Sequence, residues 1–253
     1  MRSEQQGFSY RQLPLPQTVP EGVEVWSLAL DLQAPLSPAD LAVLDASERE
    51  RIACLHFHKD RVRAVTTRAA LRRLLAGRLM TVPEALHFSV NEYGKPALQG
   101  EAGIEFNVSH AGCFAMIALS NNGRIGVDIE YQHEEIDANN LSRYILSPLE
   151  YRPAGMTQVE FIRHWVAKES VLKALGLGIS EHLQSVSILP DGNADYQVIC
   201  GYPEWPELKV WPIEAPANYS AALAMECRVQ PHEKALNLEA AADRSSASGD
   251  SGG

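Results

Sequence analysis

The stretch "FAMIALSNNGRIGVDIEY" (114–131) holds two apolar, strand-like runs separated by a turn signal. Residues 114–120 and 125–131 combine apolar and β-branched side chains, a composition typical of buried strands. The Asn-Gly pair in Asn121-Asn122-Gly123 favours a tight turn between them. We therefore expect one structural half of the chain to end here and a second half to begin.

The order of predicted elements is similar on the two sides of this junction. The first side holds strand 23–30, a helix starting at Ser37-Pro38, helix 61–79, and strands near 86–90, 104–108 and 113–120. The second side holds strand 125–131, helices 137–146 and 158–175, and strands near 184–189, 195–200, 207–213 and 218–226. This order predicts an α+β fold made of two similar halves.

The closing strands of the two halves also resemble each other, FAMIALS at 114–120 and YSAALAM at 219–225. We predict a first half at 1–123 and a second at 124–230, related by pseudo-twofold symmetry. Residues 231–253 are rich in alanine, glutamate and serine and cannot bury a core, so they are predicted to form a disordered tail.

The composition is that of a globular protein, with 45% hydrophobic and 21% charged residues in a chain of 253. No apolar run approaches the ~20 residues of a membrane span, and the start of the chain lacks the pattern of a signal peptide. The four cysteines are scattered, which predicts buried free thiols in a reducing, cytoplasmic compartment. The net charge of −10 argues against nucleic acid as a partner.

The basic residues are unevenly distributed. Residues 49–78 hold nine of the 22 lysines and arginines, against only Glu50 and Asp60. Two interpretations stay open: a solvated helix face, which is the usual place for such a run, or a patch that binds phosphates or an acidic partner.

Two acids interrupt the apolar run at 125–131. Alternate residues of a strand point to the same face, so Asp128 and Glu130 lie side by side. Two carboxylates at that spacing repel each other unless a cation or a proton relieves them. By itself, an edge strand with a wet outer face explains the pair equally well.

The stretch 161–178, which holds most of the predicted helix 158–175, makes a cation site more favourable than a wet edge strand. Trp165, Glu169 and Lys173 are spaced four residues apart and fall on nearly one face, with Lys168 beside them. An exposed Glu169–Lys173 pair would contribute only ~0.2–0.5 kcal/mol, but the tryptophan indicates that this face is partly covered. If Glu169 approaches the strand pair, three carboxylates meet, which suits Mg²⁺.

Two further stretches carry polar groups. "EFNVSHAG" (105–112) contains Ser109-His110, which we interpret as a donor pair for an anion, because sequence neighbours seldom form a nucleophile and its base. "NEYGKPAL" (91–98) is a glycine-containing turn with Lys95 at its tip.

Together and in this order, these stretches resemble the 4'-phosphopantetheinyl transferases of the two-half, Sfp type. The matching pieces are YGKP (93–96), FNVSH (106–110), GVDIE (126–130) and WVAKESVLKALGLG (165–178). "FHKDRVR" (57–63) fits the basic N-terminal segment of that family. The resemblance covers about residues 20–226.

The resemblance implies Mg²⁺-dependent transfer of 4'-phosphopantetheine from coenzyme A to a serine of an apo acyl or peptidyl carrier protein, releasing adenosine 3',5'-bisphosphate. Asp128, Glu130 and Glu169 would hold Mg²⁺ on the pyrophosphate. Lys173 and Lys168 would neutralise its charge. Glu169, or a water beside the metal, would take the serine proton.

The family's nucleotide site also maps onto this chain. Tyr93, Gly94, Lys95 and Pro96 would surround adenine, and Arg63, Ser109 and His110 would contact the 3'-phosphate, with Arg49 the nearest candidate for a further basic contact. Coenzyme A would lie in the cleft between the two halves of a monomer. The carrier's apolar helix would dock between Tyr131 and Gln158.

Two other functions are considered. A different Mg²⁺-dependent phosphoryl or nucleotidyl transferase would be expected to show a Walker loop, kinase signatures or a Rossmann fingerprint, none of which is present. A non-catalytic relative that only binds carrier protein or coenzyme A would be expected to lose acids of the metal set, whereas all three are present here.

Overall fold

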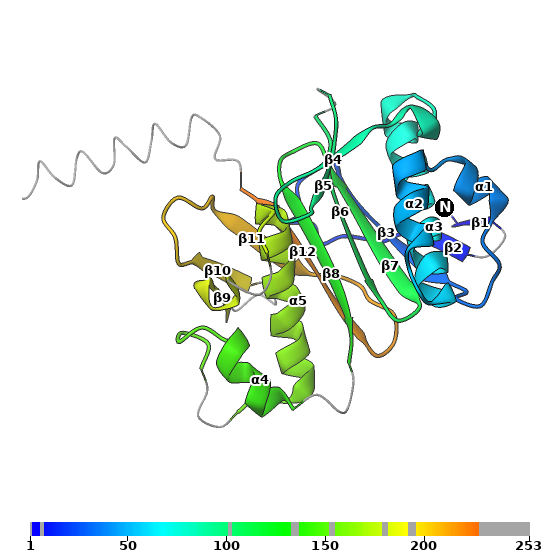
Figure 1. Ribbon diagram of the computed structural model, residues 1–253. Coiled ribbons are helices and arrows are strands. Elements are labelled where there is room, and N and C mark those ends of the chain that lie inside the picture. The colour runs from blue at the N-terminus through cyan, green and yellow to red at the C-terminus, as the bar shows by residue number, and fades with distance from the viewer. Residues whose placement is uncertain are drawn as a thin grey trace, which may run out of the picture.

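The computed structural model describes residues 2–5, 8–100, 103–132, 137–151, 155–178, 182–191 and 196–227. The predicted tail at 231–253 lies outside these residues, as do residues 228–230 at the end of the predicted second half. Two five-stranded sheets meet in the middle of the molecule, with a long helix on the outer side of each (Figure 1).

The first sheet belongs to the first half of the chain. Its half contains β1 (Arg2–Gln5), β2 (Phe8–Gln12), β3 (Val23–Leu30), α1 (Pro38–Ala42), α2 (Ala46–Ala53), α3 (His58–Leu79), η1 (Pro83–Ala85), β4 (Phe88–Val90), β5 (Pro96–Leu98), β6 (Glu105–Ala111) and β7 (Phe114–Ser120). The strand order is β1-β2-β3-β7-β6, and β4 and β5 form a separate hairpin.

The second sheet is built from the second half. This half contains β8 (Ile125–Tyr131), α4 (Ala138–Ile145), α5 (Gln158–Leu175), η2 (Leu183–Ser185), β9 (Val186–Pro190), β10 (Tyr196–Cys200), β11 (Leu208–Pro212) and β12 (Tyr219–Glu226). The strand order is β8-β12-β11-β10-β9.

The predicted α+β fold of two similar halves is confirmed by this strand order. In both halves the closing strand lies between the opening strand and the strand that precedes it in sequence, as β3-β7-β6 and as β8-β12-β11. In both halves the long helix follows the opening strand. The same path of the chain is therefore repeated, as the alternation of elements in the sequence predicts.

The Asn-Gly pair at the junction does not close a hairpin. β7 and β8 belong to different sheets, so residues 121–124 connect the two halves. Elements β1, β2, β5 and α2 are missing from the sequence prediction. Helix α2 was missed because its eight residues, ASERERIA, are mostly charged and show no apolar stripe, although Asp45 and Glu48 form a complete capping box.

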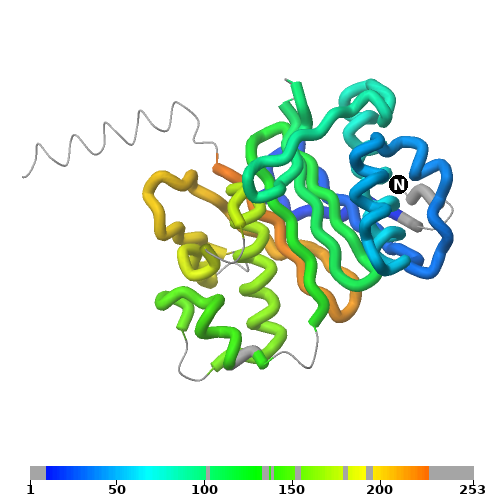
Figure 2. The backbone as a smooth tube through the Cα atoms, viewed as in Figure 1, coloured from blue at the N-terminus to red at the C-terminus, as the bar shows by residue number. Residues whose placement is uncertain are grey.

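The inner faces of the two sheets share one hydrophobic core. Side chains of Val25, Met116 and Ala118 from the first sheet pack in the same cluster as Val127 and Leu223 from the second. Strands β6 and β8 run side by side where the two halves meet, as the labels of Figure 1 and the same view in Figure 2 show. This contact brings β6 of the first half beside β8 of the second and positions the candidate site.

A side-chain hydrogen bond joins the facing strands β6 and β8. The backbone N–H of Val127 donates to Oδ1 of Asn107 at 2.9 Å, deep in the protein. A buried backbone N–H donor without such a partner would destabilise the folded protein. Asn107 therefore sets how β6 sits against β8.

Helix α5 lies unusually close to β8. A Cβ atom at Gly126 would lie 2.0 Å from the carbonyl oxygen of Ser170 and 2.5 Å from the backbone nitrogen of Ala174. Only glycine permits this approach of helix and strand backbones. The helix begins in a capping box of Thr157 and Glu160 and ends at Gly176, whose φ of 78° forms a left-handed cap.

Much of the arginine run stabilises the first half. Arg72 is fully buried, with its guanidinium 2.8 Å from Glu48 and 2.9 Å from Asp45. Arg73 pairs with Asp40 at 2.6 Å. For these residues the solvated-face interpretation is wrong, because the charges are neutralised within the protein.

All four cysteines are free, as predicted. The expectation that they are buried is wrong: Cys54 and Cys113 are exposed, and Cys200 and Cys227 are half-buried. Among the helices in the described part of the chain, none combines the length and apolar character that crossing a membrane requires.

Candidate active site

Three carboxylates converge where α5 packs on β8. Asp128 and Glu130 lie on the face of β8 that meets the helix, and Glu169 approaches from α5. Each can offer an oxygen such that all three oxygens lie within 4.8 Å of one another. Asp128 and Glu169 are only 1% and 5% exposed, so the cluster is largely removed from water.

The three carboxyl groups of this cluster have raised pKa values, which a bound cation would offset. Burial raises the pKa of Asp128, and burial together with the charge of Asp128 raises the pKa of Glu130. The same two causes raise the pKa of Glu169 to about 8. Oδ2 of Asp128 is buried and has no hydrogen-bond partner among the described residues. Buried hard oxygen donors with unmet charge fit Mg²⁺.

Lys173 supplies part of the compensation. Its Nζ lies 2.5 Å from Oδ1 of Asp128 and 3.8 Å from Oε2 of Glu169. One ammonium against three carboxylates leaves the cluster with excess negative charge. The i, i+4 pair of Glu169 and Lys173 is therefore part of a buried site and not an exposed surface pair.

Ser109 belongs to this cluster. Its hydroxyl donates to Oδ1 of Asp128 at 2.7 Å and accepts from Nζ of Lys173 at 3.0 Å. The structure places Ser109 and His110 on different faces of β6, because consecutive strand residues point to opposite faces. Ser109 orients Asp128, while His110 points the other way.

Trp165 completes the wall of the cluster. It is half-buried, and a hydrogen bond from its side chain to Glu130 partly offsets the rise in the pKa of that carboxyl. The prediction that this face of α5 is covered is confirmed.

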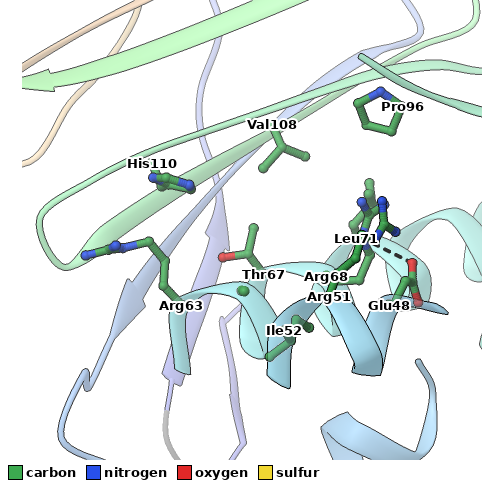
Figure 3. Close-up of a pocket in the computed structure, with 11 residues that line it drawn as sticks. Glu48, Arg51, Ile52, Arg63, Thr67, Arg68, Leu71, Pro96, Val108 and His110 are labelled. Carbon is green, nitrogen blue, oxygen red and sulfur yellow. Dashed lines mark ion pairs between the residues drawn. The ribbon is translucent and has the colours of Figure 1, made fainter. Parts of the chain in front are cut away.

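A pocket opens on the opposite face of β6. Its volume is about 210 Å³, and it lies between β6 and the helices α2 and α3 (Figure 3). The residues that line it are Glu48, Arg51, Ile52, Arg63, Ala64, Thr67, Arg68, Leu71, Pro96, Val108 and His110. Strand β6 thus carries the pocket on one face and Ser109 of the acidic cluster on the other.

Several polar atoms of the pocket wall have no protein partner. Nε of Arg63, Oγ1 of Thr67 and Nη1 of Arg68 are buried and lack a hydrogen-bond partner within the described ranges. Buried polar groups are normally paired with protein or water, so these atoms are available to a ligand. With two guanidinium donors among them, the ligand is expected to be an anion.

His110 and Arg63 lie together at one end of this pocket, and Arg51 and Arg68 lie at the other (Figure 3). Burial and the charges of Arg63 and Lys173 lower the pKa of His110. Because Ser109 of the acidic cluster precedes His110 on β6, the cluster adjoins the pocket end that Arg63 and His110 form.

Three of the predicted nucleotide contacts line this pocket: Arg63, Pro96 and His110. Arg49 does not; it is exposed on α2, whereas Arg51 and Arg68 do line the pocket. The sequence offered a signal for Arg68, because it follows Thr67 on α3. Thr67 and Leu71, which also line the pocket, lie on the same side of that helix as Arg63. The sequence offered no signal for choosing Arg51 over Arg49.

The turn between β4 and β5 lies mostly outside the pocket. Tyr93 is 47% exposed, and Gly94 adopts a φ of 81° with open space around it. The ammonium of Lys95 donates to backbone carbonyls of the second half, the shortest being that of Lys173 at 2.7 Å. Of the four turn residues, only Pro96 lines the pocket.

Lys168 does not reach the cluster. It is fully buried, pairs with Glu150 at 2.5 Å and donates to the carbonyl of Leu183 at 2.9 Å. The structure therefore does not bring Lys168 and Lys173 together, because the two side chains leave α5 in different directions. Glu150 also accepts from the backbone N–H groups of Ser147 and Ile188, which anchors the segment after α4.

Comparison with known proteins gives a consistent result over most of the chain. The family model described as 4'-phosphopantetheinyl transferase, N-terminal, matches residues 37–122, and that of the 4'-phosphopantetheinyl transferase superfamily matches residues 124–224. The 4'-phosphopantetheinyl transferase HetI of Nostoc sp. is 32% identical over 213 residues, covering 80% of this chain and 87% of the relative.

Two further relatives are more distant. The phosphopantetheinyl transferase of Thraustochytrium sp. is 29% identical over 194 residues, covering 68% of this chain and 67% of its own. The 4'-phosphopantetheinyl transferase of Bacillus subtilis is 28% identical over 182 residues, covering 64% and 80%. All three relatives are named as the same kind of transferase.

Proposed function

The chain belongs to the 4'-phosphopantetheinyl transferase superfamily and is an enzyme of that kind, and we propose that it moves 4'-phosphopantetheine from coenzyme A onto a serine of an apo acyl or peptidyl carrier protein. In this reaction the serine oxygen forms a bond to the β-phosphorus of coenzyme A. The bond from that phosphorus to the bridging oxygen breaks, and adenosine 3',5'-bisphosphate leaves.

Asp128, Glu130 and Glu169 would hold the Mg²⁺ ion. Their oxygens lie within 4.8 Å of one another, and their raised pKa values report a shortage of positive charge. A bound Mg²⁺ ion would neutralise charge on the pyrophosphate and stabilise the leaving group. Ser109 holds Asp128 in place through its hydroxyl.

The nucleotide end of coenzyme A occupies the arginine pocket. Arg63 and His110 bind the 3'-phosphate, and Arg51 and Arg68 supply further positive charge in place of Arg49. The unpaired donors of the pocket wall support this assignment, because phosphate oxygens would satisfy them. Pro96 contributes an apolar surface for adenine.

Lys173 lies between the two regions and binds the pyrophosphate. Its charge acts on both the Asp128 carboxyl and the His110 ring, so an anion beside it would be stabilised from the pocket side as well. Glu169, or a water that it orients, accepts the proton of the attacking serine.

The carrier protein docks on exposed apolar side chains around α4 and the start of α5. These are Tyr131, Leu141, Tyr144, Leu149, Tyr151 and Val159. The buried pair of Glu150 and Lys168 anchors the segment that presents Leu149 and Tyr151. An exposed apolar patch of this kind fits the apolar helix of a carrier domain.

The enzyme is proposed to act as a cytoplasmic monomer. One chain supplies both the arginine pocket and the acidic cluster, so a second copy is not needed to complete the site. The four free thiols fit a reducing compartment.

The observation that carries this proposal is the placement of the acidic cluster and the arginine pocket on opposite faces of β6. The test is the intact mass of an apo acyl carrier protein after incubation with the enzyme and coenzyme A, with Mg²⁺ or with EDTA. We expect a gain of one phosphopantetheine with Mg²⁺ and none with EDTA. No gain with this carrier or with an apo peptidyl carrier, together with calorimetric binding of coenzyme A, would contradict transfer and indicate a binding protein.

A further inference from the structure

The turn of the β4–β5 hairpin crosses from the first half to the second. The hairpin belongs to the first half, yet its turn lies against the end of α5, where the blue-green and yellow-green segments meet in Figure 2. The ammonium of Lys95 donates to the carbonyls of Lys173 at 2.7 Å, Ile125 at 3.2 Å and Ala174 at 3.3 Å. These three donations use the full capacity of an ammonium group.

A second contact from the same turn reaches the same end of the helix. Nδ2 of Asn91 donates to the carbonyl of Gly176, the helix cap, at 2.8 Å. Oδ1 of Asn91 accepts from the backbone N–H groups of Tyr93 and Lys95 at 3.0 and 2.8 Å, which makes the turn rigid. The turn therefore holds the end of α5 with two side chains on a fixed backbone.

The end of a helix is a favourable place for a cation. Its last carbonyls have no partner within the helix, and the helix dipole places partial negative charge there. Lys95 satisfies two of these carbonyls. Burial lowers its pKa to about 8, with Glu105 acting in the opposite direction. The contact is half-buried and made by three hydrogen bonds.

Lys173 connects this contact to the reaction. Its backbone carbonyl accepts from Lys95, while its side chain lies 2.5 Å from Asp128 and 3.0 Å from Ser109. One residue after Lys95, Pro96 lines the nucleotide pocket. The turn thus touches the pocket at one end and the backbone of Lys173 at the other.

We propose that Lys95 is a positioning residue: it holds the last turn of α5 so that Lys173 meets Asp128. The proposal rests on the transfer reaction proposed above. It assigns to Lys95 an effect on turnover, where contact with the nucleotide would predict an effect on affinity.

Lys95→Met tests this assignment, with Lys209→Met as the matched control because Lys209 is exposed on β11. Transfer is followed by intact mass to give kcat and KM, and affinity for adenosine 3',5'-bisphosphate is measured by calorimetry. We expect Lys95→Met to lower kcat by about tenfold or more and to change that affinity by less than about threefold. Lys209→Met is expected to leave both unchanged.

Asn91→Asp provides a second variant that keeps the turn. The carboxylate still accepts from the N–H groups of Tyr93 and Lys95, but it cannot donate to Gly176 and adds negative charge at the negative end of the helix. We expect a fall in kcat in the same direction, again with affinity retained. Melting temperatures of both variants show that the protein is folded at the assay temperature.

A double-mutant cycle distinguishes positioning from general destabilisation. If Lys95 acts through Lys173, adding Lys95→Met to Lys173→Met should not lower kcat further. Additive losses in the cycle would overturn the proposal, as would a tenfold loss of affinity with unchanged kcat. Absence of transfer by the unmodified enzyme would overturn the proposed reaction and this inference with it, whereas normal transfer by Lys95→Met would overturn the inference alone.

Discussion

Helices α3 and α5 occupy equivalent places in the two halves but carry opposite chemistry. Each follows the opening strand of its half and covers the outer face of a five-stranded sheet (Figure 1). On α3 the functional side chains are arginines, and Arg63 and Arg68 enter the pocket. On α5 they are Glu169 and Lys173 of the acidic cluster.

The two helices also differ in how their charges are balanced. Around α3 most arginines have acidic partners, as Arg72 has in Glu48 and Arg73 in Asp40. Around α5 three carboxylates share the single ammonium of Lys173. The first half nevertheless leaves Nε of Arg63 and Nη1 of Arg68 open for an anion, whereas the second half leaves carboxylates open for a cation. The two halves share a fold, but their candidate sites favour ligands of opposite charge.

Removing an acid from the second half should give the largest effect. Asp128→Ala is expected to lower kcat by about a thousandfold or more, because the metal set loses its most buried ligand and Lys173 loses its partner. Calorimetric binding of coenzyme A without Mg²⁺ should persist. Activity within tenfold of the unmodified enzyme would contradict the role of Asp128 in metal binding.

Removing an arginine of the pocket should act on affinity instead. Arg63→Ala and Arg68→Ala are each expected to weaken binding of adenosine 3',5'-bisphosphate by about 10- to 100-fold, since hydrogen bonds to charged groups contribute about 1.5–3 kcal/mol. Calorimetry gives the dissociation constants, and Arg49→Ala is the control because Arg49 is exposed outside the pocket. A loss of affinity as large for Arg49→Ala would restore Arg49 as the phosphate contact.

A pair of glycine substitutions compares how tightly the two halves are packed. Gly126→Ala is expected to lower the free energy of unfolding by about 1–3 kcal/mol, since its Cβ would meet the backbone of α5 at Ser170. Gly77→Ala, on α3, meets no atom within 4 Å and should raise it by about 0.5–1 kcal/mol. Denaturant unfolding measures both, and equal effects of the two substitutions would contradict the close approach of α5 to β8.

The pH dependence of activation by Mg²⁺ tests the charge state of the acidic cluster in the second half. Glu169 has a pKa of about 8 without a cation, so below that pH a proton must leave before the carboxylate can bind Mg²⁺. The Mg²⁺ concentration for half-maximal transfer should therefore rise by up to about tenfold as pH falls from 8 to 7. A half-activating concentration that does not change over this range would contradict the raised pKa.

Elements with a clear local pattern were predicted well from the sequence. The strand at 23–30 and the helix at 158–175 have the predicted bounds, because apolar periodicity and capping residues lie within the segments themselves. The same reasoning placed Asp128 beside Glu130 and Glu169 one turn before Lys173. Alternation in strands and helical spacing are local properties and need no knowledge of the fold.

Tertiary structure alone decided which of these faces meet. Lys95 reaches the end of α5, Lys168 turns to Glu150, and Arg51 lines the pocket where Arg49 does not. In each case the partner lies on another element, and its position depends on how the sheets and helices pack. Gly126 is part of the reason, since the missing side chain lets α5 approach β8 and brings Glu169 to the strand acids. Local sequence thus identified the candidate residues of the acidic cluster. Their partners on other elements were decided by the packing between distant segments.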